Sequence, residues 1–294
     1  MMTEVQVNYL HCFGDIIGPG RLLRPCGITT DESMNIYVAQ GPAGRITKLD
    51  QHGKFLMRIG EGEGRWFRKV GKVGAPTGIA VDRAGDLYVA DAKLNCVHRF
   101  DAQGGFVSSF GKPGRGDGEF KRCRSVRFDA AGYLWVVDAR NNRIQKFDTE
   151  GTLLLKLGAY GKDEAGKGRF DNPSDIAFDQ QGCIYVVDRS NNRVHKFDAQ
   201  GNSILEFGQA GAEEGELMYP RGIALDREQR VYVVDVSGNC VQAFDTVGHP
   251  LFSFRGPKKW GGQLNQPYGI TVDKQGRILV TDNHNDRIMV FAVS

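Results

Sequence analysis

Histidine and cysteine are the residues of this chain that would most readily supply catalysis or metal binding, and both are few and scattered. The histidines are at 11, 52, 98, 195, 249 and 284, and the cysteines are at 12, 26, 96, 123, 183 and 240. The segment DNHNDR, at residues 282–287, has donor types that could hold a metal ion, but it contains one histidine, and one histidine does not make a site. No Cys-x-x-Cys pair or Ser–His–Asp arrangement is apparent. We therefore predict no catalytic residue, no metal site and no cofactor.

Arginine and lysine offer a different chemistry, the binding of anionic groups. They are interleaved with Trp66, Phe67, Phe120 and Trp260. Basic groups beside aromatic rings suit phosphate backbones and stacked bases, and they suit acidic protein segments equally well. The residues that we predict to bind a partner are Arg21, Arg24, Arg65, Trp66, Arg68, Lys69, Lys112, Arg115, Lys121, Arg122, Arg124, Arg255, Lys258, Lys259 and Trp260.

The elements that must position these residues come from a repeat. NNRIQKFDTEG at 141–151 returns as NNRVHKFDAQG at 191–201. Each copy follows an apolar segment such as IYVVD, and six such segments end at residues 40, 91, 138, 188, 235 and 282. A period of about fifty residues indicates a repeat architecture.

Each repeat reads as four short strands, labelled a to d, separated by turns that contain Gly or Asn. Strand a is of the GIAVD type, strand b of the YVVD type, strand c of the RIQKFD type and strand d of the LLLKLG type. Alternation with a period of two indicates half-buried strands. Four-stranded sheets repeated around an axis bury both faces against their neighbours, so the fold class is an all-β, six-bladed propeller. We expect a single domain, 1–294, with blades at about 24–60, 75–111, 121–158, 172–208, 219–255 and 266–294 plus 5–14.

The sixth repeat ends after strand c, and the missing strand d is at the other end of the sequence. VNYLHCFG at 7–14 matches the strand-d segment GFVSSFG at 105–111. The N-terminal strand is therefore expected to complete the last blade and to close the ring. An open ring would leave sheet edges free to pair with other chains.

The polar residues between strands b and c have a structural interpretation. Asp138 and Asp188 end strand b, where a carboxylate can accept backbone N–H bonds of the turn, and the following Asn residues tolerate a left-handed backbone. Arginine opens strand c in four blades and is expected to pair with a turn carboxylate. These arginines are Arg45, Arg143, Arg193 and Arg287.

With these motifs the chain resembles the NHL-repeat family of six-bladed propellers. P-x-G-I-A-x-D, Y-V-V-D, N-N-R-I and F-D-x-x-G are written nearly as the family has them, although Asn-Asn-Arg or Asn-Asp-Arg replaces the namesake Asn-His-Leu. The resemblance covers essentially the whole chain and implies the fold. It implies little about function, because some NHL proteins read RNA, and relatives in the wider propeller class are metal-dependent lyases or lactonases.

Ligands of propellers are bound mainly on the face that carries the d–a and b–c loops. The d–a loops, 14–26, 60–77, 111–124, 158–174, 208–221 and 255–268, contain 18 basic and 11 acidic residues, while the whole chain has a formal charge of +3. Positive charge is therefore expected on this face, mostly on blades six, one, two and three. The alternative is a solvated rim without a ligand.

The channel mouth has a departure from the repeat. Arg127 is in a slot where other blades have Ala or Thr, and Asp175 replaces a recurrent Gly on the next blade. A buried arginine needs a partner, so we expect a salt bridge between them, or an anion site shared with Arg124. The channel-mouth residues are Arg124, Arg127, Asp175, Arg221 and Tyr268.

The leading functional hypothesis is a non-catalytic binding scaffold with a protein partner, working as a subunit or adaptor. RNA binding is one alternative, and a metal-dependent lyase or lactonase is another. Scattered cysteines indicate reduced thiols and a cytoplasmic location. No apolar stretch approaches 18 residues, so no membrane insertion is expected. By itself the chain is expected to be a monomer.

Overall fold

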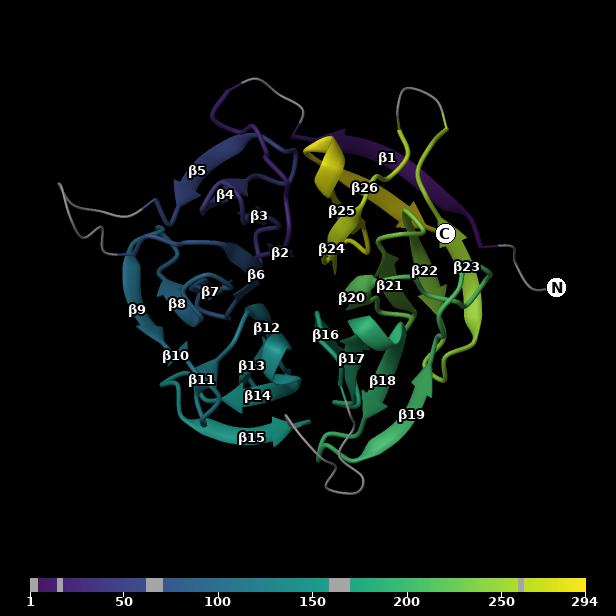
Figure 1. Ribbon diagram of the computed structural model, residues 1–294. Helices are drawn as coiled ribbons and strands as arrows, with labels where there is room; N and C mark the ends of the chain where they lie inside the picture. Colours follow the sequence, from purple (N-terminus) through teal and green to yellow (C-terminus); the bar gives the residue numbers. More distant parts are fainter. Residues whose placement is uncertain (1–4, 15–17, 62–70, 159–169, 259–261) are drawn as a thin grey trace.

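The computed structural model describes residues 5–14, 18–61, 71–158, 170–258 and 262–294. In these ranges six four-stranded antiparallel sheets surround a central channel, as Figure 1 shows. The chain is an all-β, six-bladed propeller, as the repeat predicts. No helix in the described ranges is long and apolar enough to cross a membrane.

The blades follow one another around the ring, and strand a of each lies nearest the channel (Figure 1). Blade one contains β2 (Ile28–Thr30), β3 (Ile36–Gln40), β4 (Arg45–Leu49) and β5 (Phe55–Ile59). Blade two contains β6 (Pro76–Val81), β7 (Leu87–Asp91), β8 (Cys96–Phe100) and β9 (Phe106–Phe110). Blade three contains β12 (Cys123–Phe128), β13 (Leu134–Asp138), β14 (Arg143–Phe147) and β15 (Leu153–Leu157).

The second half of the ring has the same order. Blade four contains β16 (Ile176–Phe178), β17 (Ile184–Asp188), β18 (Arg193–Phe197) and β19 (Ser203–Phe207). Blade five contains β20 (Pro220–Leu225), β21 (Val231–Asp235), β22 (Cys240–Phe244) and β23 (Pro250–Phe254). Blade six contains β24 (Pro267–Val272), β25 (Ile278–Asp282), β26 (Arg287–Val293) and β1 (Val7–Phe13). The remaining elements are β10 (Lys112–Pro113), β11 (Glu119–Phe120) and the 3₁₀ turns η1 (Ala139–Asn141), η2 (Arg189–Asn191) and η3 (Asn283–Asn285).

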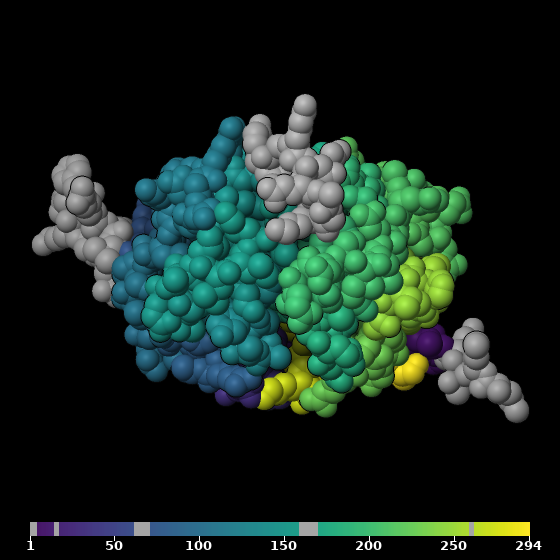
Figure 2. Space-filling model, turned by 90° about the horizontal axis from the view of Figure 1, so that it is seen from below, coloured from purple at the N-terminus to yellow at the C-terminus, as the bar shows by residue number. Residues whose placement is uncertain are grey.

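The ring is closed by pairing of the first described strand with the last. β1 runs antiparallel to β26 from Val7↔Val293 to Phe13↔Ile288. The Gln6 and Ser294 backbones exchange two further hydrogen bonds of 3.0 Å. Figure 2 shows the N-terminal segment, in purple, beside the C-terminal end, in yellow. The expected closure is therefore present.

The apolar core consists of clusters between neighbouring blades. In β13, Leu134 and Val136 pack against blade two, while Trp135 and Val137 pack against blade four. This follows from the period of two, which sends successive side chains to opposite faces of a sheet. The pattern recurs around the described ring, where six such clusters fill the six interfaces between blades.

Three of the four strand-c arginines form the expected pair with the carboxylate that ends strand b. The Nε–Oδ2 distances are 2.8 Å for Arg143–Asp138, 3.0 Å for Arg193–Asp188 and 2.7 Å for Arg287–Asp282. For Arg45 the prediction was wrong. Blade one ends strand b with Gln40, which offers no carboxylate, and Arg45 donates to the Arg21 carbonyl instead.

Asparagines of the b–c turns connect neighbouring blades in four of the six cases, through Asn95, Asn142, Asn192 and Asn239. Asn142 and Asn192 adopt the left-handed backbone that the sequence predicts, at φ 54° and 52°. The Asn142 side-chain oxygen accepts from the Asn172 N–H at 2.9 Å, and that of Asn192 accepts from the Tyr219 N–H at 2.8 Å. The asparagine thus fits the turn and also bonds across the blade interface.

We expect graded losses of stability from two substitutions of Asn192. Asn192→Gly keeps the left-handed backbone but removes the bond to Tyr219, which should lower the unfolding free energy by about 1 kcal/mol. Asn192→Ala adds the left-handed strain of a side chain with Cβ, for about 2 kcal/mol in all. Denaturant titration measures both values. Equal losses in the two variants would contradict a contribution from the backbone.

Candidate anion site at the channel mouth

The middle position of the P-x-G motif, and the equivalent position in blades three and four, places one residue from each blade at the channel mouth. These six residues line a cavity of about 400 Å³, together with the six residues that follow them in sequence. The first set comprises Cys26, Thr77, Arg124, Ser174, Arg221 and Tyr268. Two of its members are arginines, whereas the other four are uncharged.

The residues after this ring explain why four blades need glycine. A Cβ on Gly27 would lie 2.4 Å from the Thr77 carbonyl oxygen, and one on Gly269 would lie 2.4 Å from the Cys26 carbonyl oxygen. Neighbouring strands a therefore approach too closely for a side chain. Blades three and four have Ser125 and Asp175 at this position, and the Ser125 hydroxyl donates to Asp175 at 2.5 Å.

Arg127 and Asp175 form the expected salt bridge below the mouth. Arg127 Nη2 lies 2.9 Å from Asp175 Oδ2, and both side chains are largely buried. The Asp175 carboxylate also accepts from the Ile176 and Ile223 N–H groups. Burial raises the pKa of the Asp175 carboxyl, and the Arg127 guanidinium opposes that shift. The pair satisfies both charged groups in the channel.

A set of arginines around Arg124 is not neutralised in this way. Arg122, Arg124 and Arg221 line the mouth cavity and also an adjoining depression of about 410 Å³. Arg140 and Arg189 line the depression as well. We call these five residues the mouth arginines. None of them forms an ion pair or a side-chain hydrogen bond with a described residue.

Two aromatic rings orient members of this set. The Arg221 guanidinium lies 3.6 Å from the Tyr268 ring centroid, and that of Arg189 lies 5.4 Å from the Tyr219 centroid. Arg124 is 8% exposed, and its buried Nη1 has no partner in the described residues. Burial and the neighbouring guanidinium groups lower the pKa of Arg124 to about 9. Burial also lowers the pKa of Arg221, to about 10.

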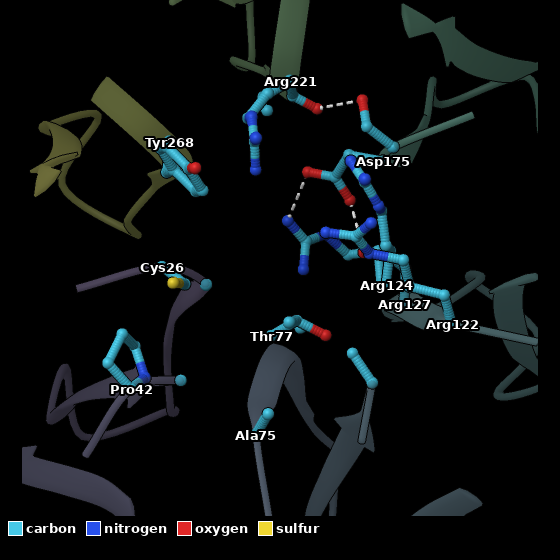
Figure 3. A pocket seen from close by; sticks show the side chains of 18 residues that line it. Cys26, Pro42, Ala75, Thr77, Arg122, Arg124, Arg127, Asp175, Arg221 and Tyr268 are labelled. Atoms are coloured by element: carbon cyan, nitrogen blue, oxygen red, sulfur yellow. Dashed lines mark hydrogen bonds and ion pairs between the residues drawn. The ribbon is translucent and has the colours of Figure 1, made fainter. Parts of the chain in front are cut away.

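The structure brings all five predicted channel-mouth residues together around one cavity (Figure 3). Of the predicted partner-binding residues, Arg124 is buried in the cavity wall, and the other described ones are exposed: Arg21, Arg24, Lys112, Arg115, Lys121, Arg122, Arg255 and Lys258. The rest lie outside the described residues: Arg65, Trp66, Arg68, Lys69, Lys259 and Trp260.

Two parts of the sequence interpretation need correction. Phe120, expected among the rim aromatics, is fully buried between Phe110 and Phe147, because β11 folds it under its own loop. A count of charges in the d–a loops misses Arg140 and Arg189, because these two residues lie in b–c turns, directly after strand b. The signal was available, because each comes within two residues of the aspartate that ends that strand.

The histidine of DNHNDR contacts an arginine. His284 Nε2 lies 3.1 Å from Arg24 Nη1. In the described part of the chain, no three His, Cys, Asp or Glu side chains are grouped in a way that could hold a metal ion.

Comparison with protein families gives two matches. The NHL repeat matches residues 74–100 and 264–291, which are blade two and blade six. A family described as a 6-bladed beta-propeller, DUF5128, matches residues 168–254. Blades two and six are therefore NHL repeats within a six-bladed propeller. No curated protein sequence matches it.

Solved structures share the fold of this six-bladed propeller at low identity. A streptogramin B lyase is 18% identical, with 99% of this chain and 98% of that chain covered and a TM-score of 0.66. A protein of unknown function from Bacteroides thetaiotaomicron is 15% identical, with coverage of 99% and 76% and a TM-score of 0.73. A gluconolactonase from Xanthomonas campestris is 14% identical, with coverage of 92% and 86% and a TM-score of 0.67. At these identities the likeness extends to the fold alone.

Proposed function

We propose that this six-bladed propeller is a non-catalytic binding module that holds an acidic segment of a protein partner on the face around the mouth arginines. One observation carries the proposal: five guanidinium groups gather there without a carboxylate partner among the described residues. Surface arginines are ordinarily solvated one by one. A bound anion would balance the charge of a group that is partly buried and mutually repulsive.

Exposed apolar side chains beside the mouth arginines favour protein over RNA as the partner. Tyr219 is 52% exposed and packs against Arg189, and Met218 precedes it. Leu94 is exposed next to Asn95, whose side chain accepts from the Arg122 N–H. Aliphatic side chains among arginines and aromatics are typical of protein interfaces. Single-stranded RNA relies on stacking, for which Leu94 and Met218 are unsuitable.

Replacing exposed charges of this face is expected to weaken capture of the natural partner from a lysate by at least about tenfold, mainly through slower association. The charge variant is Lys121→Gln/Arg122→Gln/Arg140→Gln. Each site is exposed, so stability should change by no more than about 0.5 kcal/mol per substitution. The matched control is Arg83→Gln/Arg227→Gln/Lys274→Gln, whose residues line the cavity at the other end of the channel.

A second variant separates protein from RNA. Leu94→Ser/Met218→Ser should speed dissociation of a protein partner and leave an RNA complex intact. Loss of the partner after nuclease treatment would instead indicate RNA. If the control variant loses the partner while the charge variant keeps it, the proposed face is wrong.

A further inference from the structure

The mouth cavity and the adjoining depression form one composite site with two unlike parts. The depression is lined by the five mouth arginines and by polar groups such as Asn142, Asn172 and Ser190, and Asp171 is the one acidic residue among its described lining residues. The cavity is lined on its other side by Cys26, Pro42, Ala75, Thr77 and Tyr268. Figure 3 shows Arg122, Arg124, Arg127 and Asp175 along one wall and Cys26 and Pro42 across from them, with Arg221 next to Tyr268.

Arg127 lies at the inner end of the mouth cavity. A second cavity, of about 980 Å³, occupies the other end of the channel. Arg127 lines both cavities and is the one described residue that they share. The salt bridge to Asp175 and bonds to the Ile79 and Val126 carbonyls hold Arg127 at this boundary.

Arg124 lines both the mouth cavity and the depression. Its burial is unfavourable for the folding free energy. Its guanidinium is almost wholly buried, has no partner at Nη1 among the described residues and faces the positive charges of Arg122, Arg189 and Arg221. A buried, unpaired charge of this kind destabilises a fold unless a ligand pairs with it. Residues that lower stability without a structural partner concentrate at binding sites.

From this geometry we infer that the composite site binds a phosphomonoester whose compact, uncharged body enters the mouth cavity while its phosphate lies among the mouth arginines. The inference rests on the proposed function in taking this face as the binding face. A volume of about 400 Å³ is in the range of small-ligand pockets.

Charge favours a phosphate over a carboxylate. A phosphomonoester carries a charge of about −1.5 to −2 at neutral pH and has three strong acceptor oxygens. It can pair with several guanidinium forks at once. A carboxylate, with a single charge and two oxygens, would balance less of this positive charge and pair with fewer guanidinium groups than a phosphate.

Calorimetric titration of the full chain with phenyl phosphate, inorganic phosphate and benzoate tests the inference. We expect phenyl phosphate to bind at least about tenfold more tightly than either of the others, because it alone uses both parts of the site. Arg124→Met/Arg221→Met should weaken phenyl phosphate and inorganic phosphate by at least tenfold, and Arg227→Met is the matched control. Ala75→Leu, which fills the cavity, should weaken phenyl phosphate and spare inorganic phosphate.

Thermal denaturation distinguishes a ligand site from a structural one. Arg124→Met should raise the melting temperature of the free protein, since it removes an unpaired buried charge, and should abolish stabilisation by added phosphate. A structural role for Arg124 predicts a lower melting temperature. Absence of any phosphate binding by the wild type, or binding that survives Arg124→Met/Arg221→Met, would overturn the inference.

The phosphate can belong to a free small molecule or to a phosphorylated side chain of a protein partner. A phosphotyrosine peptide that binds at least tenfold more tightly than phenyl phosphate would identify the second source, and equal or weaker binding would identify the first. A 5′-phosphorylated oligonucleotide that binds equally well after dephosphorylation would count against a phosphomonoester site. If the wild-type protein binds phosphate but the charge variant still captures the natural partner, this inference stands and the proposed function is overturned.

Discussion

Deletion of residues 1–14 is expected to turn the protein into an aggregating or strand-exchanged chain. The deletion removes β1 and exposes the paired edge of β26, whose residues from Ile288 to Phe291 are buried apolar side chains. It also removes Phe13 from the cluster between blades six and one. Loss of a buried phenylalanine alone lowers the unfolding free energy by about 3–5 kcal/mol. That loss corresponds to a fall in melting temperature of roughly 6–20 °C.

Light scattering after size-exclusion chromatography and a thermal melt measure this outcome. Deletion of residues 1–4 is the control, because it leaves β1 whole and should change neither quantity. A monomeric 1–14 deletion with an unchanged melting temperature would show that the ring does not depend on closure by β1.

The second large effect is expected at the channel pair. Asp175→Ala should lower the unfolding free energy by roughly 3 kcal/mol, because Arg127 is left largely buried without its carboxylate. The double variant Arg127→Ala/Asp175→Gly copies the residues of other blades, as in Ala80 and Gly78, and should recover most of that loss.

A double-mutant cycle of Arg127→Ala, Asp175→Gly and the double variant, followed by denaturant titration, measures the coupling between the two sites. We expect an interaction energy of roughly 2 kcal/mol. If the double variant loses as much stability as the two single variants together, the two residues act independently, and the channel pair is not the stabilising unit.

The sequence was sufficient to predict the fold because every feature of the repeat indicates the same architecture. Alternating apolar residues, turn asparagines and the displaced strand at 7–14 all specify one blade and its closure, and β1 pairs as they predict. The Arg127–Asp175 pair was also predictable. A charged residue at a position where the other blades have Ala or Thr indicates a partner at the equivalent position of a neighbouring blade.

The composition of the mouth arginines was only partly predictable. Arg124 and Arg221 follow from the P-x-G register, but Arg189 joins them from the b–c turn of another blade, and linear sequence does not give the spacing between loops of different blades. Phe120 was misassigned for a related reason. A two-residue pairing of β10 with β11 folds the loop back on itself and buries a ring that a sequence count places on the rim.

The pairing of β1 with β26 has a consequence for how the protein is made. Val7 and Val293 are partners in the closed ring, so β1 leaves the ribosome long before its partner strand exists. At about 5–20 residues per second, that delay is roughly 15–60 s. The inner blades can fold on their neighbours during this time, whereas the N-terminal strand waits unpaired. Blades one to five are therefore expected to form before blade six, which needs both β1 and β26.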